Sequence, residues 1–207
     1  MARPGRQAVR KGAKPRLIAI DGVDGAAVVA AARRAIEAPT RGGISHWDAS
    51  GVFQDLAVAE SAAGSPSART LLLLYAADLA FRLRWEIRPA LAEGRTVIAA
   101  PYVDTAVAYG RAAGLPAGWL TNLFRFAPRA ADRRFVHVSK GHAQSNAAGF
   151  FEFVCRRMDG GRKGAAARRL IAAAAAQLRQ REPLAQTRTT DRTSVRPTVN
   201  GRRPPAL

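Results

Sequence analysis

One short segment has the spacing of a phosphate-binding motif but not its residue types. The pattern G-x-x-x-x-G-K-[ST], whose backbone amides, lysine and hydroxyl hold phosphates and magnesium, overlies residues 22–29. Gly22 takes the first glycine position, whereas Ala27, Val28 and Val29 replace the second glycine, the lysine and the hydroxyl residue. Valine brings no charge to a phosphate and ligates no cation. The segment therefore predicts the frame of a phosphoryl-transfer site without its chemistry.

Two interpretations of this segment remain open. The amides of the turn and of the following helix could still form a weak anion site, to which Gly22, Asp24 and Gly25 would belong. Alternatively, the turn only joins a strand to a helix, and Val28 and Val29 pack in the core.

A second block of sequence resembles one enzyme family over about residues 17–132. The segments SARTLLLLYAAD (67–78), IRPALAEG (87–94), TVIAAPYVDT (96–105) and GLPAGWL (114–120) are similar, in the same order, to segments of the bacterial thymidylate kinases. The resemblance implies a nucleoside-monophosphate-kinase fold. For an active member it also implies phosphate transfer from ATP to dTMP with Mg²⁺; otherwise no cofactor is expected.

The chain departs from this family in the acceptor half of the site as well. Where the family has Asp-Arg-Tyr, this chain has Ala100, Pro101 and Tyr102, and Leu79 stands where the family has an arginine that reads the thymine edge. Proline cannot replace the bidentate hydrogen bonds that an arginine donates to a phosphate. The resemblance therefore implies lost or altered thymine selectivity, and we assign no catalytic residue.

The remaining matches define a vestigial nucleotide site. An aromatic residue at the position of Tyr75 stacks on the base in the family, although core packing explains the tyrosine equally well. Lid arginines could come from Arg156, Arg157 or residues 159–163, for which a solvated helix end is the simpler interpretation. The residues that the resemblance places near the nucleotide, some of which could equally serve packing, are Gly22, Asp24, Gly25, Arg69, Tyr75, Tyr102, Asp104 and Tyr109.

Charge is concentrated at the two ends of the chain. The net charge is +18, yet residues 17–155 carry 14 basic and 12 acidic side chains. We expect a disordered basic arm at 1–15, one domain at 16–182 and a disordered basic tail at 183–207. Both ends could neutralise nucleic-acid phosphates, but they lack aromatic residues on which bases could stack.

The composition also excludes several classes of protein. No apolar run approaches the ~20 residues of a membrane helix, and the N-terminus lacks the apolar core of a secretory signal. The single cysteine fits a reducing compartment, so we expect a cytoplasmic protein without membrane contact. No metal site is predicted, because the three histidines share no ligand spacing with Cys155.

Strand-like runs alternate with helical segments, which predicts a parallel β-sheet flanked by helices on both faces. The expected fold is a three-layer α/β domain of the P-loop nucleoside-monophosphate-kinase type. Strands are expected at 17–20, 44–48, 96–100 and 135–138, and the helices at 26–38, 52–62, 69–91, 105–113, 117–124, 147–157 and 164–181.

Three functions remain open at this point. The first is a thymidylate-kinase-like protein without efficient kinase activity, acting in binding of a nucleoside monophosphate or in protein interaction. The second is an active dTMP kinase, which would need a cation from elsewhere, such as Arg16, Lys140 or the lid. The third is a nucleic-acid-associated protein that uses its basic tails. The resemblance also implies a homodimer, for which the apolar 71–83 face could serve.

Overall fold

A four-stranded, all-parallel sheet in the order β2-β3-β1-β4 forms the centre of the domain. The computed structural model describes residues 14–36, 42–59, 65–136 and 149–181. Ala19 pairs with Ala99 on one side and with Arg133 on the other. The strands are β1 (Leu17–Gly22), β2 (Gly42–His46), β3 (Thr96–Ala100) and β4 (Asp132–Val136).

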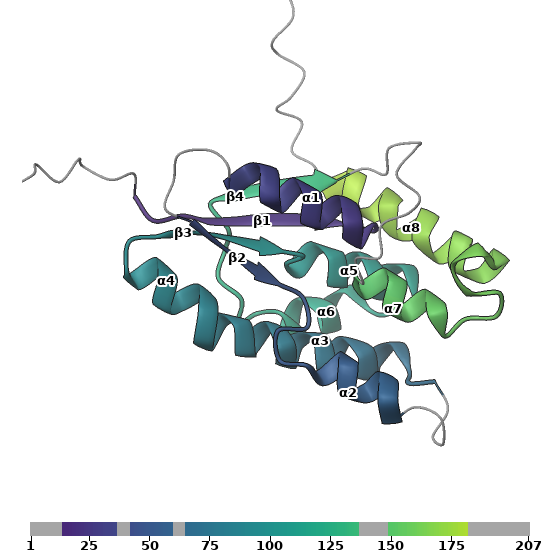
Figure 1. The fold of residues 1–207 in the computed structure, drawn as a ribbon. Helices are drawn as coiled ribbons and strands as arrows, with labels where there is room; N and C mark the ends of the chain where they lie inside the picture. The colour runs from purple at the N-terminus through teal and green to yellow at the C-terminus, as the bar shows by residue number, and fades with distance from the viewer. Residues whose placement is uncertain (1–13, 37–41, 60–64, 137–148, 182–207) are drawn as a thin grey trace, which may run out of the picture.

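Helices cover both faces of this sheet, which confirms the predicted α/β class. Figure 1 shows α1 on one face, and α3, α4, α5 and α6 on the other. The helices are α1 (Gly25–Ile36), α2 (Val52–Ala59), α3 (Ala68–Arg82), α4 (Arg88–Ala92), α5 (Val103–Ala112), α6 (Ala117–Leu123), α7 (Phe150–Arg156) and α8 (Ala165–Arg181), with a π-helical turn at Leu83–Ile87 and a short 3-10 helix at Gly161–Lys163.

The alternation of side chains along β1 creates two apolar cores. Ile18 and Ile20 pack with Val28 of α1 on one face, whereas Leu17 and Ala19 join the larger core under α3, α5, α7 and α8. Successive residues of a strand point to opposite faces, so each face receives every second side chain. This alternation places Asp21 on the same face as α5.

The predicted elements differ from the observed ones mainly near the end of the domain. β4 begins at Asp132, three residues before the predicted start, and α7 begins at Phe150. The predicted helix at 69–91 has a π-helical turn inside it. Ser67 caps the N-terminus of α3, because the Thr70 amide donates to Ser67 Oγ at 3.1 Å.

The described ranges test the predictions for the chain ends and for membrane spans only in part. Residues 1–13 of the predicted arm and the whole predicted tail lie outside them. Of the helices in the described part of the chain, none combines the length and the apolar composition of a membrane span.

Candidate functional site

The turn after β1 is shorter than a phosphate-binding loop requires. α1 already begins at Gly25, two residues before Ala27, the position of the second motif glycine. Asp24 accepts a hydrogen bond from the Ala27 amide at 2.9 Å, which is the usual geometry of a helix N-cap. Val28, at the lysine position, is buried against the sheet. The motif positions after the turn therefore form the first turns of a helix.

The amides that would face a phosphate face carboxylates instead. Glu152 of α7 accepts a hydrogen bond from the Gly25 amide at 3.2 Å, beside the Ala27–Asp24 bond. Arg162 pairs with Glu152, and its Nη2 lies 3.5 Å from Asp24 Oδ2. A helix N-terminus attracts negative charge, and here two side chains of the chain itself supply it. A phosphate could enter only by displacing Glu152.

Backbone contact between α7 and the turn closes the same place. A Cβ added at Gly25 would lie 2.7 Å from the Gly149 Cα, and one added at Gly149 would lie 2.7 Å from the Gly25 Cα. No real side chain tolerates such a distance, so both positions require glycine. Gly25 thus allows the backbone of the turn to pack directly against Gly149, at the N-terminus of α7.

The pocket expected for the base is filled by a phenylalanine. The ring centroid of Phe150 lies 5.0 Å from that of Tyr75 and 5.1 Å from that of Tyr109. Tyr75 has no exposed surface, and its hydroxyl donates to the Tyr102 carbonyl. Burial, with a smaller effect from Cys155, raises the pKa of Tyr109 to about 12. Tyr75 and Tyr109 both contact the Phe150 ring, so a base could stack on Tyr75 only if this ring moved.

A buried carboxylate ties the end of β1 to the start of α5. Asp21 Oδ1 accepts hydrogen bonds from the Tyr102 amide at 2.9 Å and from the Thr105 amide and hydroxyl at 2.9 and 2.8 Å. The Gly22 amide donates to the same hydroxyl at 3.1 Å. Burial, together with the charge of Asp104, raises the pKa of Asp21 to about 6, although the hydrogen bonds oppose this shift. The amide of Gly22 is thereby engaged in the hydrogen bonds that connect β1 to α5.

Sequence reasoning missed a buried arginine at the neighbouring strand end. Arg82 is fully buried and donates to Ser45 Oγ and to the Ser45 and Pro101 carbonyls, each at 2.9 Å. Its Nη1 lies 3.8 Å from Asp78 Oδ2, and Ser45 Oγ donates to Glu86 at 2.6 Å. The available signal was the four-residue spacing of Asp78, Arg82 and Glu86 on one face of an apolar helix.

The structure also shows the contacts of other basic residues that the resemblance or the lid hypothesis named. Arg69 is exposed, and its guanidinium stacks over the Trp119 ring at 5.6 Å, between α3 and α6. Arg157 donates to the Phe153 carbonyl at 2.8 Å. Of the predicted lid residues, Arg162 is the one shown in contact with the turn after β1.

The residues at this turn do not fit a magnesium–nucleotide complex. Val29 offers no hydroxyl, and both oxygens of Asp24 and Oε1 of Glu152 are engaged by α1 amides and by Arg162, which leaves Glu152 Oε2 without a hydrogen-bond partner among the described residues. In the described ranges, no group of three or more His, Cys, Asp or Glu residues is placed to hold a metal ion.

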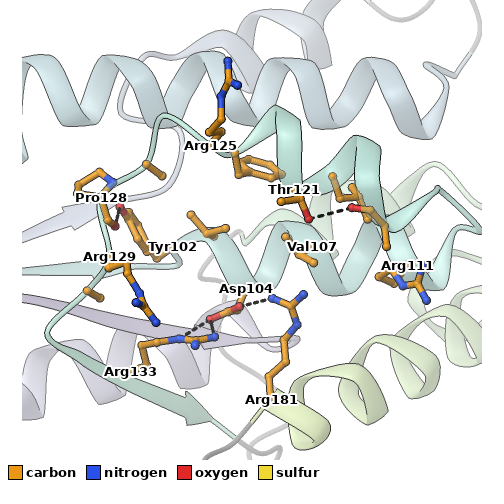
Figure 2. A pocket seen from close by; sticks show the side chains of 16 residues that line it. Tyr102, Asp104, Val107, Arg111, Thr121, Arg125, Pro128, Arg129, Arg133 and Arg181 are labelled. Atoms are coloured by element: carbon orange, nitrogen blue, oxygen red, sulfur yellow. Dashed lines mark hydrogen bonds and ion pairs between the residues drawn. The ribbon is translucent and has the colours of Figure 1, made fainter.

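Tyr102 and Asp104 belong to a different, open pocket on α5 (Figure 2). Asp104, Val107 and Arg111 share one face of α5 because they are three and four residues apart, whereas Tyr109 faces Phe150 from another side of the helix. Tyr102 and Asp104 therefore line a different part of the molecule from Tyr109.

Comparison with known proteins gives a short similarity only. No protein-family model matches the chain. The chain is 46% identical over 57 residues to a protein of Pyrococcus horikoshii described as "Probable thymidylate kinase". The aligned stretch spans 28% of this chain and 28% of that protein. This stretch, with the parallel α/β sheet, supports a thymidylate-kinase-like relationship.

Proposed function

We propose that this chain is a thymidylate-kinase-like protein that lacks efficient phosphoryl transfer and acts by binding, as a protein-interaction module. The observation that carries the proposal is the N-terminus of α1, where Asp24 and Glu152 occupy the amides that a phosphate would need. Phe150 supports it independently, because its ring fills the space between Tyr75 and Tyr109.

The expected loss of rate follows from how such kinases work. Phosphoryl transfer relies on positioned charge, and the loss of one such group typically costs about 3 kcal/mol of transition-state stabilisation. This chain has valines at the lysine and hydroxyl positions and Pro101 at the acceptor arginine position. Three missing groups would reduce the rate by several orders of magnitude.

An active dTMP kinase is the second candidate, and one observation favours it. Arg162 brings a guanidinium to the turn after β1, where the motif lysine is missing. Its two ion-pair partners, Asp24 and Glu152, largely neutralise that charge. We therefore rank this candidate below the first. The nucleic-acid role concerns residues outside the described ranges.

A turnover assay separates the two candidates. The full chain would be incubated with Mg-ATP and, in turn, dTMP, dUMP, dGMP and dCMP, and the diphosphate products would be separated by chromatography. We expect no product above a protein-free blank. Formation of dTDP that disappears in both Asp24→Ala and Arg162→Ala would refute the proposal and establish the kinase. Turnover that survives both variants would indicate a contaminating enzyme if a mock purification without the chain shows it too, and would refute the proposal if the mock purification shows none.

The homodimer stays a proposal, with a corrected surface. The leucines at 71, 72, 79 and 83 of the predicted 71–83 face are buried in the core. Leu73, Phe81 and Trp85 are exposed instead, by 53%, 39% and 64%. These three residues define an apolar stripe along α3 and the π-helical turn. We propose that two copies of the chain pair through this α3 stripe.

A further inference from the structure

A large open cavity lies beside α5, on the face that carries Asp104. It encloses about 620 Å³, which is within the usual size of about 300–1,000 Å³ for small-molecule sites. Its walls come from α5, α6, residues 124–130, the start of β4 and the end of α8. We call it the basic pocket, because its lining includes Arg111, Arg125, Arg129, Arg133 and Arg181.

Positive charge exceeds negative charge at one end of the basic pocket. Asp104 accepts hydrogen bonds from Arg133 Nε at 2.9 Å and from Arg181 Nη1 at 2.7 Å. Figure 2 shows the side chain of Arg129 turned toward this same pair, whereas Arg111 and Arg125 lie on the rim. Asp104 is the one acidic residue of the lining. Three guanidinium groups therefore lie at this end of the pocket beside one carboxylate, which pairs with two of them.

An unbalanced cluster of this kind favours an anionic ligand. Arginine keeps its charge at all relevant pH values, so the repulsion cannot be relieved by deprotonation. An added anion would relieve it, and the planar fork of arginine matches phosphate oxygens in pairs. The pocket also has apolar walls, formed by Val107, Leu120 and Phe124. A ligand that matches both the arginine cluster and the apolar walls carries several phosphate charges and an apolar or aromatic group.

We propose that the basic pocket binds a small organic polyphosphate. Its phosphates would lie against Arg129, Arg133 and Arg181, and its body would lie against Leu120 and Phe124. This site is independent of the closed turn after β1 and of Phe150. A nucleic acid is the weaker alternative, because the cluster around Asp104 lies within a hollow, where a small molecule fits better than a duplex.

The test is calorimetric titration of the full chain with ADP, inorganic tripolyphosphate and a short DNA duplex at physiological salt. β4 supplies a matched control. Arg133 and Arg134 are adjacent, similarly exposed (43% and 50%), and each pairs with an aspartate. Neighbouring strand residues point to opposite faces, so Arg134 lies away from the pocket. The pair separates pocket binding from general attraction to a strongly basic chain.

We expect ADP to bind, with affinity reduced about tenfold or more in Arg133→Gln and Arg129→Gln and little changed in Arg134→Gln. Arg129→Gln leaves both ion pairs of Asp104 intact, so this variant tests the proposal even if Arg133→Gln does not fold. Equal losses in the Arg133 and Arg134 variants, or no ADP binding, would overturn the proposal. Tripolyphosphate binding as tight as ADP would overturn its organic part, and binding of DNA alone would favour a nucleic acid.

Discussion

Replacing Phe150 with alanine tests whether this ring occupies a former base pocket. Phe150 is 1% exposed, and its ring lies within 6.2 Å, centroid to centroid, of five other aromatic rings. Truncation of a buried phenylalanine costs about 3–5 kcal/mol, and the larger values belong to sites that cannot collapse. Rigid rings on several elements surround this site, so we expect a loss of about 4 kcal/mol in the free energy of unfolding.

The assay is urea unfolding followed by circular dichroism, with and without millimolar thymidine. Thymidine carries no charge, so the basic surface does not attract it. A ligand that binds only the folded state raises the midpoint. We expect thymidine to raise the midpoint of Phe150→Ala and to leave the original chain unchanged.

The matched control is Phe151→Ala. Phe151 is the next residue of α7 and is equally buried, but its recorded ring contacts are with Tyr109 and Phe150 and do not include Tyr75. It should lose a similar stability and gain no response to thymidine. A thymidine response in the Phe151 variant or in the original chain would refute the reasoning, as would a loss below about 2 kcal/mol in Phe150→Ala.

Three further predictions concern other parts of the fold. Because the pKa of Asp21 is raised from 3.8 to about 6, the folded state binds more protons than the unfolded one in that window, and stability falls as the pH rises through it. The free energy of unfolding of Asp21→Asn, minus that of the original chain, should therefore be about 3 kcal/mol larger at pH 8 than at pH 4, measured by urea unfolding. A difference that does not change with pH would contradict this. Arg82→Met should lose about 3–5 kcal/mol, because the buried carboxylate of Asp78 loses its ion-pair partner; a neutral result would show that the pair adds nothing. Trp85→Glu should shift the sedimentation of the full chain from dimer to monomer without changing its circular dichroism, and an unchanged dimer would exclude the α3 stripe as the interface.

Local sequence was sufficient for the two central strands, β1 and β3, and for most helices. Apolar runs mark β1 and β3, because both strands are buried on both faces. The Ser67 cap follows from its own residue type and position. The burial of Val28 agrees with the interpretation of the 22–29 segment as a strand-to-helix connection.

Features that depend on distant partners could not be predicted in this way. β4 starts with Asp132, Arg133 and Arg134, which give no apolar alternation. Arg133 pairs with Asp104, which lies 29 residues earlier in the chain. The Glu152 contact to Gly25 joins residues 127 positions apart. The resemblance places Tyr75 and Tyr109 near a nucleotide, but only the fold shows that both contact the ring of Phe150.

The contact of Glu152 with α1 has a consequence for how the protein responds to its surroundings. A carboxylate attached to the same chain is present at a high effective concentration, so a dissolved phosphate competes poorly with it. In a ligand-binding kinase, stability rises and falls with the supply of nucleotide. Here the chain carries its own anion at that position. Phosphate binding at the N-terminus of α1 should therefore add nothing to the stability of the fold, and any response to cellular nucleotides would have to come from the basic pocket.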